Sequence, residues 1–134
     1  MQDSSNAALK SPARHTRGRG LSWDILCRVV DNYGDAAVCW RLARALAHEQ
    51  AGRVRLWIDQ PEALQALQGL SSAWADGWCY QGVDLHRLDA EGASLQGVTP
   101  AQVVVDAFGS GVPAAFEQAM AQRQPASLVV VLDY

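Results

Sequence analysis

The chain has 134 residues, of which 49% are hydrophobic and 19% are charged, and its formal net charge is −3. This balance predicts a globular domain with a hydrophobic core and argues against a disordered chain. The mildly acidic total gives no sign of binding to nucleic acid or to an anionic membrane, and no apolar run approaches the ~20 residues of a membrane span.

The first 20 residues are polar and become basic near their end, which predicts a disordered tail followed by a domain over residues 21–134. The N-terminus also lacks the apolar core of a signal peptide. Cys27, Cys39 and Cys79 form no CxxC pair, so we interpret them as free thiols of a cytoplasmic protein. The histidines are not spaced near them as metal ligands, and we expect no metal site.

The first half of the domain alternates strands and helices. Trp23–Val30 is a nearly continuous apolar run, typical of a strand buried on both faces. A helix is predicted over Asp35–Gln50, a second strand over Val54–Asp59, and a short helix over Pro61–Leu67. The apolar positions of the first helix recur at helical spacing: Val38, Leu42, Ala45 and Leu46.

The second half is less regular at its start. Trp78–Leu88 predicts an irregular strand and Asp89–Pro100 a loop. Ala101–Phe108 and Ser127–Tyr134 read as buried strands, separated by a helix over Pro113–Gln122. Strands alternating with helices imply right-handed βαβ units and a mostly parallel sheet. The predicted fold class is α/β, a Rossmann-like three-layer domain.

An acidic turn follows the first strand, in VVDNYGDAAVCW. Asp31 and Asp35 flank Gly34 at the carboxyl end of a strand, the usual ligand position in an open α/β sheet. Two interpretations stay open: the acids cap the helix N-terminus, or they bind a ligand. Pyrophosphate is a poor candidate, because its fingerprint needs three glycines and carboxylates repel phosphate. A cationic or proton-donating ligand suits the turn better.

A second candidate is the FGSG segment, Phe108–Gly111, which follows the next buried strand. Its small residues let a ligand approach the backbone, although a flexible turn before Pro113 explains them equally well. Asp59, Asp106 and Asp133 also end predicted strands, and Asp59 suits a cap for the Pro61 helix.

The segment WDILCRVVDNYGDAAVCWRLARAL, residues 23–46, resembles the opening of the bacterial elongation factor P arginine rhamnosyltransferases, WDIFCxVVDNxGDxGVxWRLAxxL. The segments VRLWID, VVVDAFGSGVP and LVVVLDY also follow the family's order, so the resemblance covers about residues 23–134. The departures are mild: the family usually has other residues at Ala37, Asp106, Ser110 and Asp133.

This resemblance implies the N-terminal, acceptor-side half of a B-type glycosyltransferase fold, truncated before the domain that holds most of the donor, dTDP-β-L-rhamnose. The implied reaction transfers rhamnose, with inversion, to an arginine of elongation factor P. Asp31 and Asp35 match two family aspartates required for activity. We expect Asp35 to accept the proton and Asp31 to orient the guanidinium. Further acceptor contacts are expected from Asn32, Tyr33, Gly34, Phe108, Gly109 and Ser110.

No cofactor is implied besides the donor substrate, and the expected partner is elongation factor P. The fragment alone is expected to be inactive, because the donor site lies in the missing domain. The alternative is a non-catalytic, truncated Rossmann-like module that at most docks elongation factor P.

Overall fold

The computed structural model describes residues 20–29, 33–50, 52–68 and 77–133. The predicted N-terminal tail lies outside these residues, apart from Gly20. The elements, in chain order, are β1 (Trp23–Cys27), α2 (Gly34–Gln50), β2 (Val54–Ile58), α3 (Pro61–Gln68), β3 (Trp78–Tyr80), β4 (Val83–Arg87), the 3₁₀ turn η1 (Ala93–Leu95), β5 (Val103–Ala107), α4 (Ala114–Gln122) and β6 (Leu128–Leu132).

The strands form a six-stranded sheet in the order β3-β4-β2-β1-β5-β6. All neighbours pair in parallel except β3, which pairs antiparallel with β4. From β1 the chain moves outward to β2 and β4, then returns to the other side of β1 to form β5. The strand order therefore reverses between β1 and β5, and ligands of open α/β sheets bind at such a switch point. This confirms the predicted Rossmann-like α/β fold.

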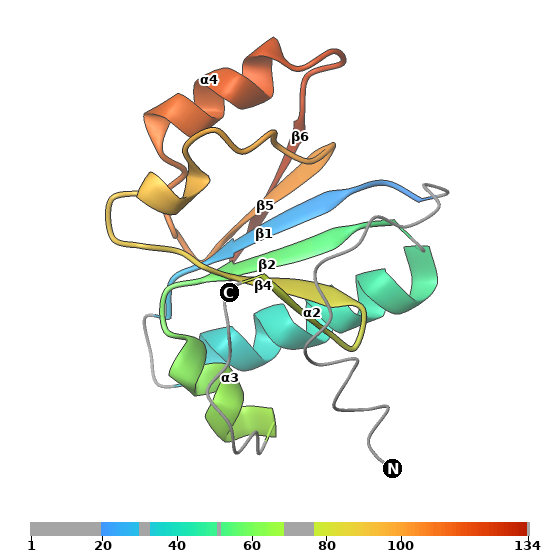
Figure 1. Ribbon diagram of the computed structural model, residues 1–134, viewed down its shortest axis with the longest axis vertical. Helices are drawn as coiled ribbons and strands as arrows, with labels where there is room; N and C mark the ends of the chain where they lie inside the picture. The colour runs from blue at the N-terminus through green and yellow to red at the C-terminus, as the bar shows by residue number, and fades with distance from the viewer. Residues whose placement is uncertain (1–19, 30–32, 51, 69–76, 134) are drawn as a thin grey trace.

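Helices cover both faces of the sheet, with α2 and α3 on one face and α4 with η1 on the other (Figure 1). Ile25 and Leu56 of the sheet pack in one cluster with Ala36, Cys39 and Ala43 of α2. Leu26 and Val104 point to the opposite face and pack with Phe116 and Met120 of α4. Each central strand is therefore buried on both faces, as its continuous apolar sequence predicted.

The region predicted as an irregular strand over Trp78–Leu88 is a hairpin. Cys79 pairs with Asp84 in its antiparallel arms, and Gln81 and Gly82 turn the chain with φ angles of 53° and 84°. Only the second arm, β4, joins β2 in parallel. A turn of this kind needs left-handed backbone, for which Gly82 is suited.

The last strand corrects the prediction of a buried strand over Ser127–Tyr134. Residues 128–131 of β6 are exposed, with Val131 69% and Leu128 63% accessible. The reason is position: β6 is the outermost strand beside β5, so its apolar sequence does not place it in the core. Periodicity alone does not distinguish a central strand from an exposed edge strand with the same composition.

The buried face of α2 also differs from the prediction. The expected stripe, which included Ala45 and Leu46, is exposed or half-buried. Three of the buried apolar residues are small, namely Ala36, Cys39 and Ala43 at 0% exposure, and they are joined by the large Trp40 at 2%. Small side chains let the helix lie close to the sheet, so the larger aliphatic residues flank the contact. Trp40 and Trp57 both lie in the core.

A buried ion pair lies near the edge where the parallel strands begin, here called the amino edge. The Asp24 carboxylate, fully buried in β1, accepts hydrogen bonds from Arg55 Nε (2.6 Å) and Nη2 (2.7 Å). It also accepts from Trp57 Nε1 (2.9 Å) and from the Ala101 N–H (2.9 Å). Four donors satisfy this anion, so it joins β1, β2 and the entry to β5 without an unpaired buried charge.

Candidate functional site

The candidate site lies where β1, β2, β4 and β5 end, here called the carboxyl edge. Cys27 at the end of β1 pairs with Ile58 of β2 and with Ala107 of β5. The segments that follow β1 and β5 therefore leave the sheet side by side, at the switch point. The sequence placed one candidate in each segment, and the structure puts both at the same place.

The start of α2 carries the described part of the acidic turn. Tyr33 is 47% exposed, and its carbonyl accepts the N–H of Ala37 (2.9 Å), which begins the helix. Asp35 is the second residue of α2 and is 1% exposed. An acid in the first helical turn is stabilised by the helix dipole. Asp35 is therefore a buried acid at a helix N-terminus, next to the exit of β1.

Asp31 and Asn32, the other predicted residues of this turn, lie outside the described residues. The geometry of the expected aspartate pair is therefore not given by the structure. Tyr33, Gly34 and Asp35 are placed together at the end of β1, and the division of roles between the two acids stays a prediction.

The FGSG segment is a strained turn. Phe108 has a φ of 56°, an unusual value for a bulky residue, and Gly109 and Gly111 have φ values of 67° and 79°. Ser110 is 6% exposed, and its Oγ donates a short hydrogen bond to Asp106 Oδ1. Asp106, which was noted only as a strand end, thus fixes the predicted contact residue Ser110 from within β5.

Arg28 links the exit of β1 to the FGSG segment and to the loop after β4, and it was not singled out in the sequence. Its Nε donates to the Ser110 carbonyl (3.0 Å), and its Nη2 donates to the carbonyls of Asp89 (3.0 Å) and Ala90 (3.4 Å). The signal in the sequence was a single charge inside the apolar run ILCRVV. Such a residue at a strand end is expected to have polar partners when it is half-buried.

Val29, which follows Arg28, is bound on both backbone groups by side chains of the segment after β2. Asp59 Oδ1 accepts the N–H of Val29 (2.8 Å), and Gln60 Nε2 donates to the Val29 carbonyl (3.1 Å). Asp59 was predicted to suit a helix cap; the structure shows that its carboxylate fixes the exit of β1. The backbone that leads into the acidic turn is therefore held on both sides.

Cys27, below the turn, is a buried thiol with no role as a nucleophile. Cys27 and Cys39 are free and buried, as predicted, and the Cys27 Sγ lies 3.8 Å from the Asp35 carbonyl that accepts from it. A hydrogen bond with Cys39, followed by burial, raises the pKa of the Cys27 thiol far above its ordinary value. The thiol stays protonated, and the thiolate is the reactive form.

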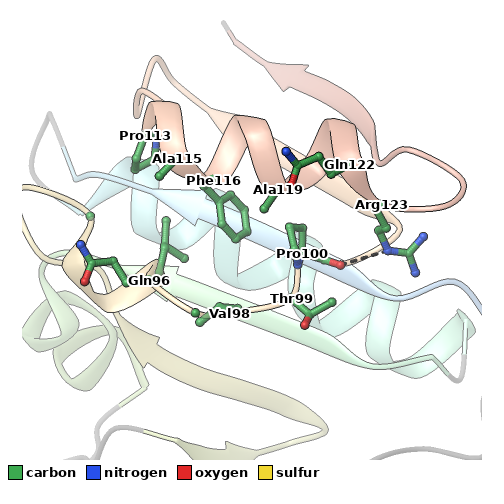
Figure 2. Close-up of a pocket in the computed structure, with 13 residues that line it drawn as sticks. Gln96, Val98, Thr99, Pro100, Pro113, Ala115, Phe116, Ala119, Gln122 and Arg123 are labelled. Carbon is green, nitrogen blue, oxygen red and sulfur yellow. Dashed lines mark hydrogen bonds between the residues drawn. The ribbon is translucent and has the colours of Figure 1, made fainter.

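A pocket of about 440 Å³ lies elsewhere, along α4. Phe116 and Ala119 of the helix face it, opposite Val98 and Pro100 of the segment after η1 (Figure 2). Arg123 closes one end by donating from Nε to the Pro100 carbonyl (3.1 Å). Of the predicted site residues that the structure describes, none lines this pocket.

Among the residues that the structure describes, no group of three or more His, Cys, Asp or Glu side chains is placed to hold a metal ion. In the same part of the chain, no helix has both the length and the apolar character needed to cross a membrane. The carboxyl edge instead gathers single carboxylates at strand ends and a helix start, at Asp35, Asp59 and Asp106.

The comparison with protein families decides the relationship. A family model described as elongation factor P (EF-P) rhamnosyltransferase EarP matches residues 23–134. The chain belongs to this family. Its members modify elongation factor P. The match begins at the first residue of β1 and includes the acidic turn, the FGSG segment and β6.

Curated relatives agree with this assignment. A protein-arginine rhamnosyltransferase of Pseudomonas aeruginosa is 44% identical over 113 residues, which are 84% of this chain and 29% of the relative. Relatives of the same name from Pseudomonas putida and Shewanella oneidensis are 42% identical over 114 residues and 32% identical over 98 residues. The chain spans about 29% of the length of the two Pseudomonas relatives.

Proposed function

We propose that this chain forms the acceptor side of an inverting protein-arginine rhamnosyltransferase that transfers rhamnose from dTDP-β-L-rhamnose to an arginine of elongation factor P. The observation that carries the proposal is the buried acid Asp35 at the switch point, inside the segment that the family model matches. The reaction is placed in the cytoplasm, in keeping with the free thiols of Cys27 and Cys39.

Arginine is a difficult nucleophile, because its lone pairs are delocalised and the guanidinium stays protonated near neutral pH. A carboxylate does not deprotonate the free guanidinium at equilibrium. It can accept hydrogen bonds from the planar N–H fork, and it can take the proton while the C–N bond forms. In the proposal Asp35 takes this proton, and Asp31 accepts from the fork and orients the attacking nitrogen.

The local structure supports an attraction to cations. Asp35 is shielded from bulk water. The attraction between opposite charges is stronger in such a buried place than in solution. Tyr33, exposed beside it, offers an aromatic face to a guanidinium. Phe108, Gly109 and Ser110 border the same edge from β5, where a chain carrying the acceptor arginine can approach the backbone.

The sugar is attacked on the face opposite its leaving group, and dTDP departs from the other side. An inverting transfer therefore needs no nucleophile from the enzyme. The donor is proposed to be held mainly by a second Rossmann-like domain facing this one, in the B-type arrangement. The chain alone is accordingly expected to bind the acceptor without transferring sugar.

Mass spectrometry of the acceptor tests this function. The chain is co-expressed with elongation factor P and with the part of a family member that follows the matched region. We expect the mass of the acceptor to rise by one deoxyhexose. Asp31→Asn and Asp35→Asn should each reduce the modified fraction by roughly 100-fold or more, the usual scale for a lost general base. Full modification by both variants would refute the site assignment.

The matched control is Glu49→Gln, an exposed carboxylate at the other end of α2. It removes the same charge from the same helix, and modification should be unchanged. A comparable loss in this variant would mean that net charge, rather than the acidic turn, governs the reaction.

The second candidate function is a non-catalytic module that docks elongation factor P. The observation that favours it is the exposure of Tyr33 and Gly109 at the carboxyl edge, which is sufficient for docking without transfer. Binding of elongation factor P with no transfer, even when the rest of a family member is supplied, would select this alternative.

A further inference from the structure

Arg28 makes hydrogen bonds to two segments that are distant from it in the sequence. It follows β1 by one residue and continues the side of the strand that carries Asp24 and Leu26. Its guanidinium reaches the Ser110 carbonyl after β5, and the Asp89 and Ala90 carbonyls after β4. One planar side chain therefore spans the exits of β1, β4 and β5.

Carbonyl oxygens are the partners of Arg28 in all these contacts. A guanidinium carries its donors in a fixed fork, so it holds its acceptors at set positions. A lysine ammonium is a compact charge on a flexible stem and does not impose the same geometry. The contacts therefore fix where the loops lie, in addition to satisfying the charge.

The loops that Arg28 joins also touch each other directly. A Cβ placed on Gly92 would lie 2.5 Å from Pro113 Cγ, so the loop after β4 packs tightly against the start of α4. Asp89 in the same loop accepts from the Ser94 N–H and Oγ, both at 3.1 Å. Hydrogen bonds within the loop after β4 therefore stabilise its conformation. Arg28 binds carbonyls of this loop and the Ser110 carbonyl at the same time.

We propose that Arg28 is a positioning residue, which holds the strained Phe108–Ser110 turn against the exit of β1 and so completes the surface that receives the acceptor arginine. The proposal rests on the proposed function for the identity of the acceptor. Phe108 adopts a φ of 56°, which persists only where surrounding contacts enforce it. Arg28 supplies such a contact two residues away.

Amide exchange measured by NMR on the 134-residue chain tests the positioning. The reporter is the Ser110 N–H, which donates to the Ala107 carbonyl (3.2 Å). Arg28→Gln should speed its exchange about tenfold or more, because the charge-assisted hydrogen bond to the Ser110 carbonyl is lost. Arg28→Lys should give an intermediate rate. Unchanged Ser110 exchange in Arg28→Gln would overturn the proposal.

The matched control is Arg123→Gln. Arg123 is also half-buried and also donates to loop carbonyls, those of Pro100 and Pro125, both at 3.1 Å, but it lies at the end of α4. This variant should leave Ser110 exchange unchanged. Equal acceleration in both variants would indicate general loosening of the fold and would contradict a role specific to Arg28.

Binding of elongation factor P by the same variants provides the second readout. Arg28→Gln should weaken binding roughly tenfold, Arg28→Lys less, and Arg123→Gln not at all. Faster Ser110 exchange with unchanged affinity would overturn the claim that the turn belongs to the acceptor surface. If the wild-type chain does not bind elongation factor P, docking by this chain fails, while the exchange rates still decide whether Arg28 holds the turn.

Discussion

The two ends of the parallel sheet use charged side chains in different ways. Near the amino edge, the ion pair of Asp24 and Arg55 is buried, and both partners accept or donate several hydrogen bonds. At the carboxyl edge, Arg28 and Asp59 bind backbone groups of the segments that leave the strands. The first arrangement joins strands to one another, and the second fixes loops. The same strands therefore carry a buried ion pair near one end and contacts with loop backbone at the other.

The largest expected effect is at the amino edge. Asp24→Asn removes the anion beside the buried Arg55 guanidinium, and breaking one side of a buried pair costs about 3–5 kcal/mol. Urea denaturation should show this loss in the free energy of unfolding. Arg44→Gln, on the exposed side of α2, should change it by less than about 0.5 kcal/mol. A loss below about 1 kcal/mol for Asp24→Asn would show that the pair does not anchor the sheet.

A smaller effect distinguishes the centre of the sheet from its lateral edge. Val104 of β5 is fully buried, and Val131 of β6 is 69% exposed. Val104→Thr buries a hydroxyl and should cost about 1–3 kcal/mol, whereas Val131→Thr should stay within about 0.5 kcal/mol. Thermal or urea unfolding of the two variants measures the difference. Equal losses would mean that β6 is covered in solution.

The smallest effect concerns the loop after β4, whose Asp89 and Ala90 carbonyls accept from Arg28. The pKa of Asp89 lies below its ordinary value, mainly because its carboxylate accepts a hydrogen bond from the Ser94 backbone N–H. A hydrogen bond from the Ser94 hydroxyl lowers the pKa further. The ionised form therefore stabilises the folded state above the unfolded pKa of about 3.9. This contribution disappears as pH falls through the lower folded pKa.

Asp89→Asn should accordingly be slightly less stable than wild type near pH 6, and the difference should vanish in strong acid. Denaturation curves across this pH range measure it. A difference that grows as the pH falls would contradict the assignment, because the sign of the linkage would then be reversed.

Much of the fold could be predicted from the sequence, because the central strands are continuous apolar runs separated by helical periodicity. Trp23–Cys27 and Val103–Ala107 formed as expected, since both faces of these strands are covered. The prediction failed for β6, whose valines give the same pattern at an exposed position. Composition records the preference for a strand, whereas burial depends on which elements lie next to it.

The candidate site could be located from the sequence but not assembled from it. The acidic turn and the FGSG segment were found because polar and small residues interrupt apolar strands. Arg28 was missed because its partners are backbone carbonyls 61 to 82 positions away, which leave no residue pattern. Asp24 and Arg55 were missed for a similar reason: each is a single charge in a strand, and their pairing depends on the register of β1 and β2.

The most direct test of the acceptor face is NMR mapping of elongation factor P on the isotope-labelled 134-residue chain. We expect the amide signals of Tyr33–Ala37 and Phe108–Ser110 to shift on titration, while those of Asp24 and Arg55 do not. An acceptor whose modified arginine is replaced by lysine should give weaker shifts at Asp35. Shifts confined to the amino edge, or to the pocket along α4, would contradict an acceptor site at the carboxyl edge.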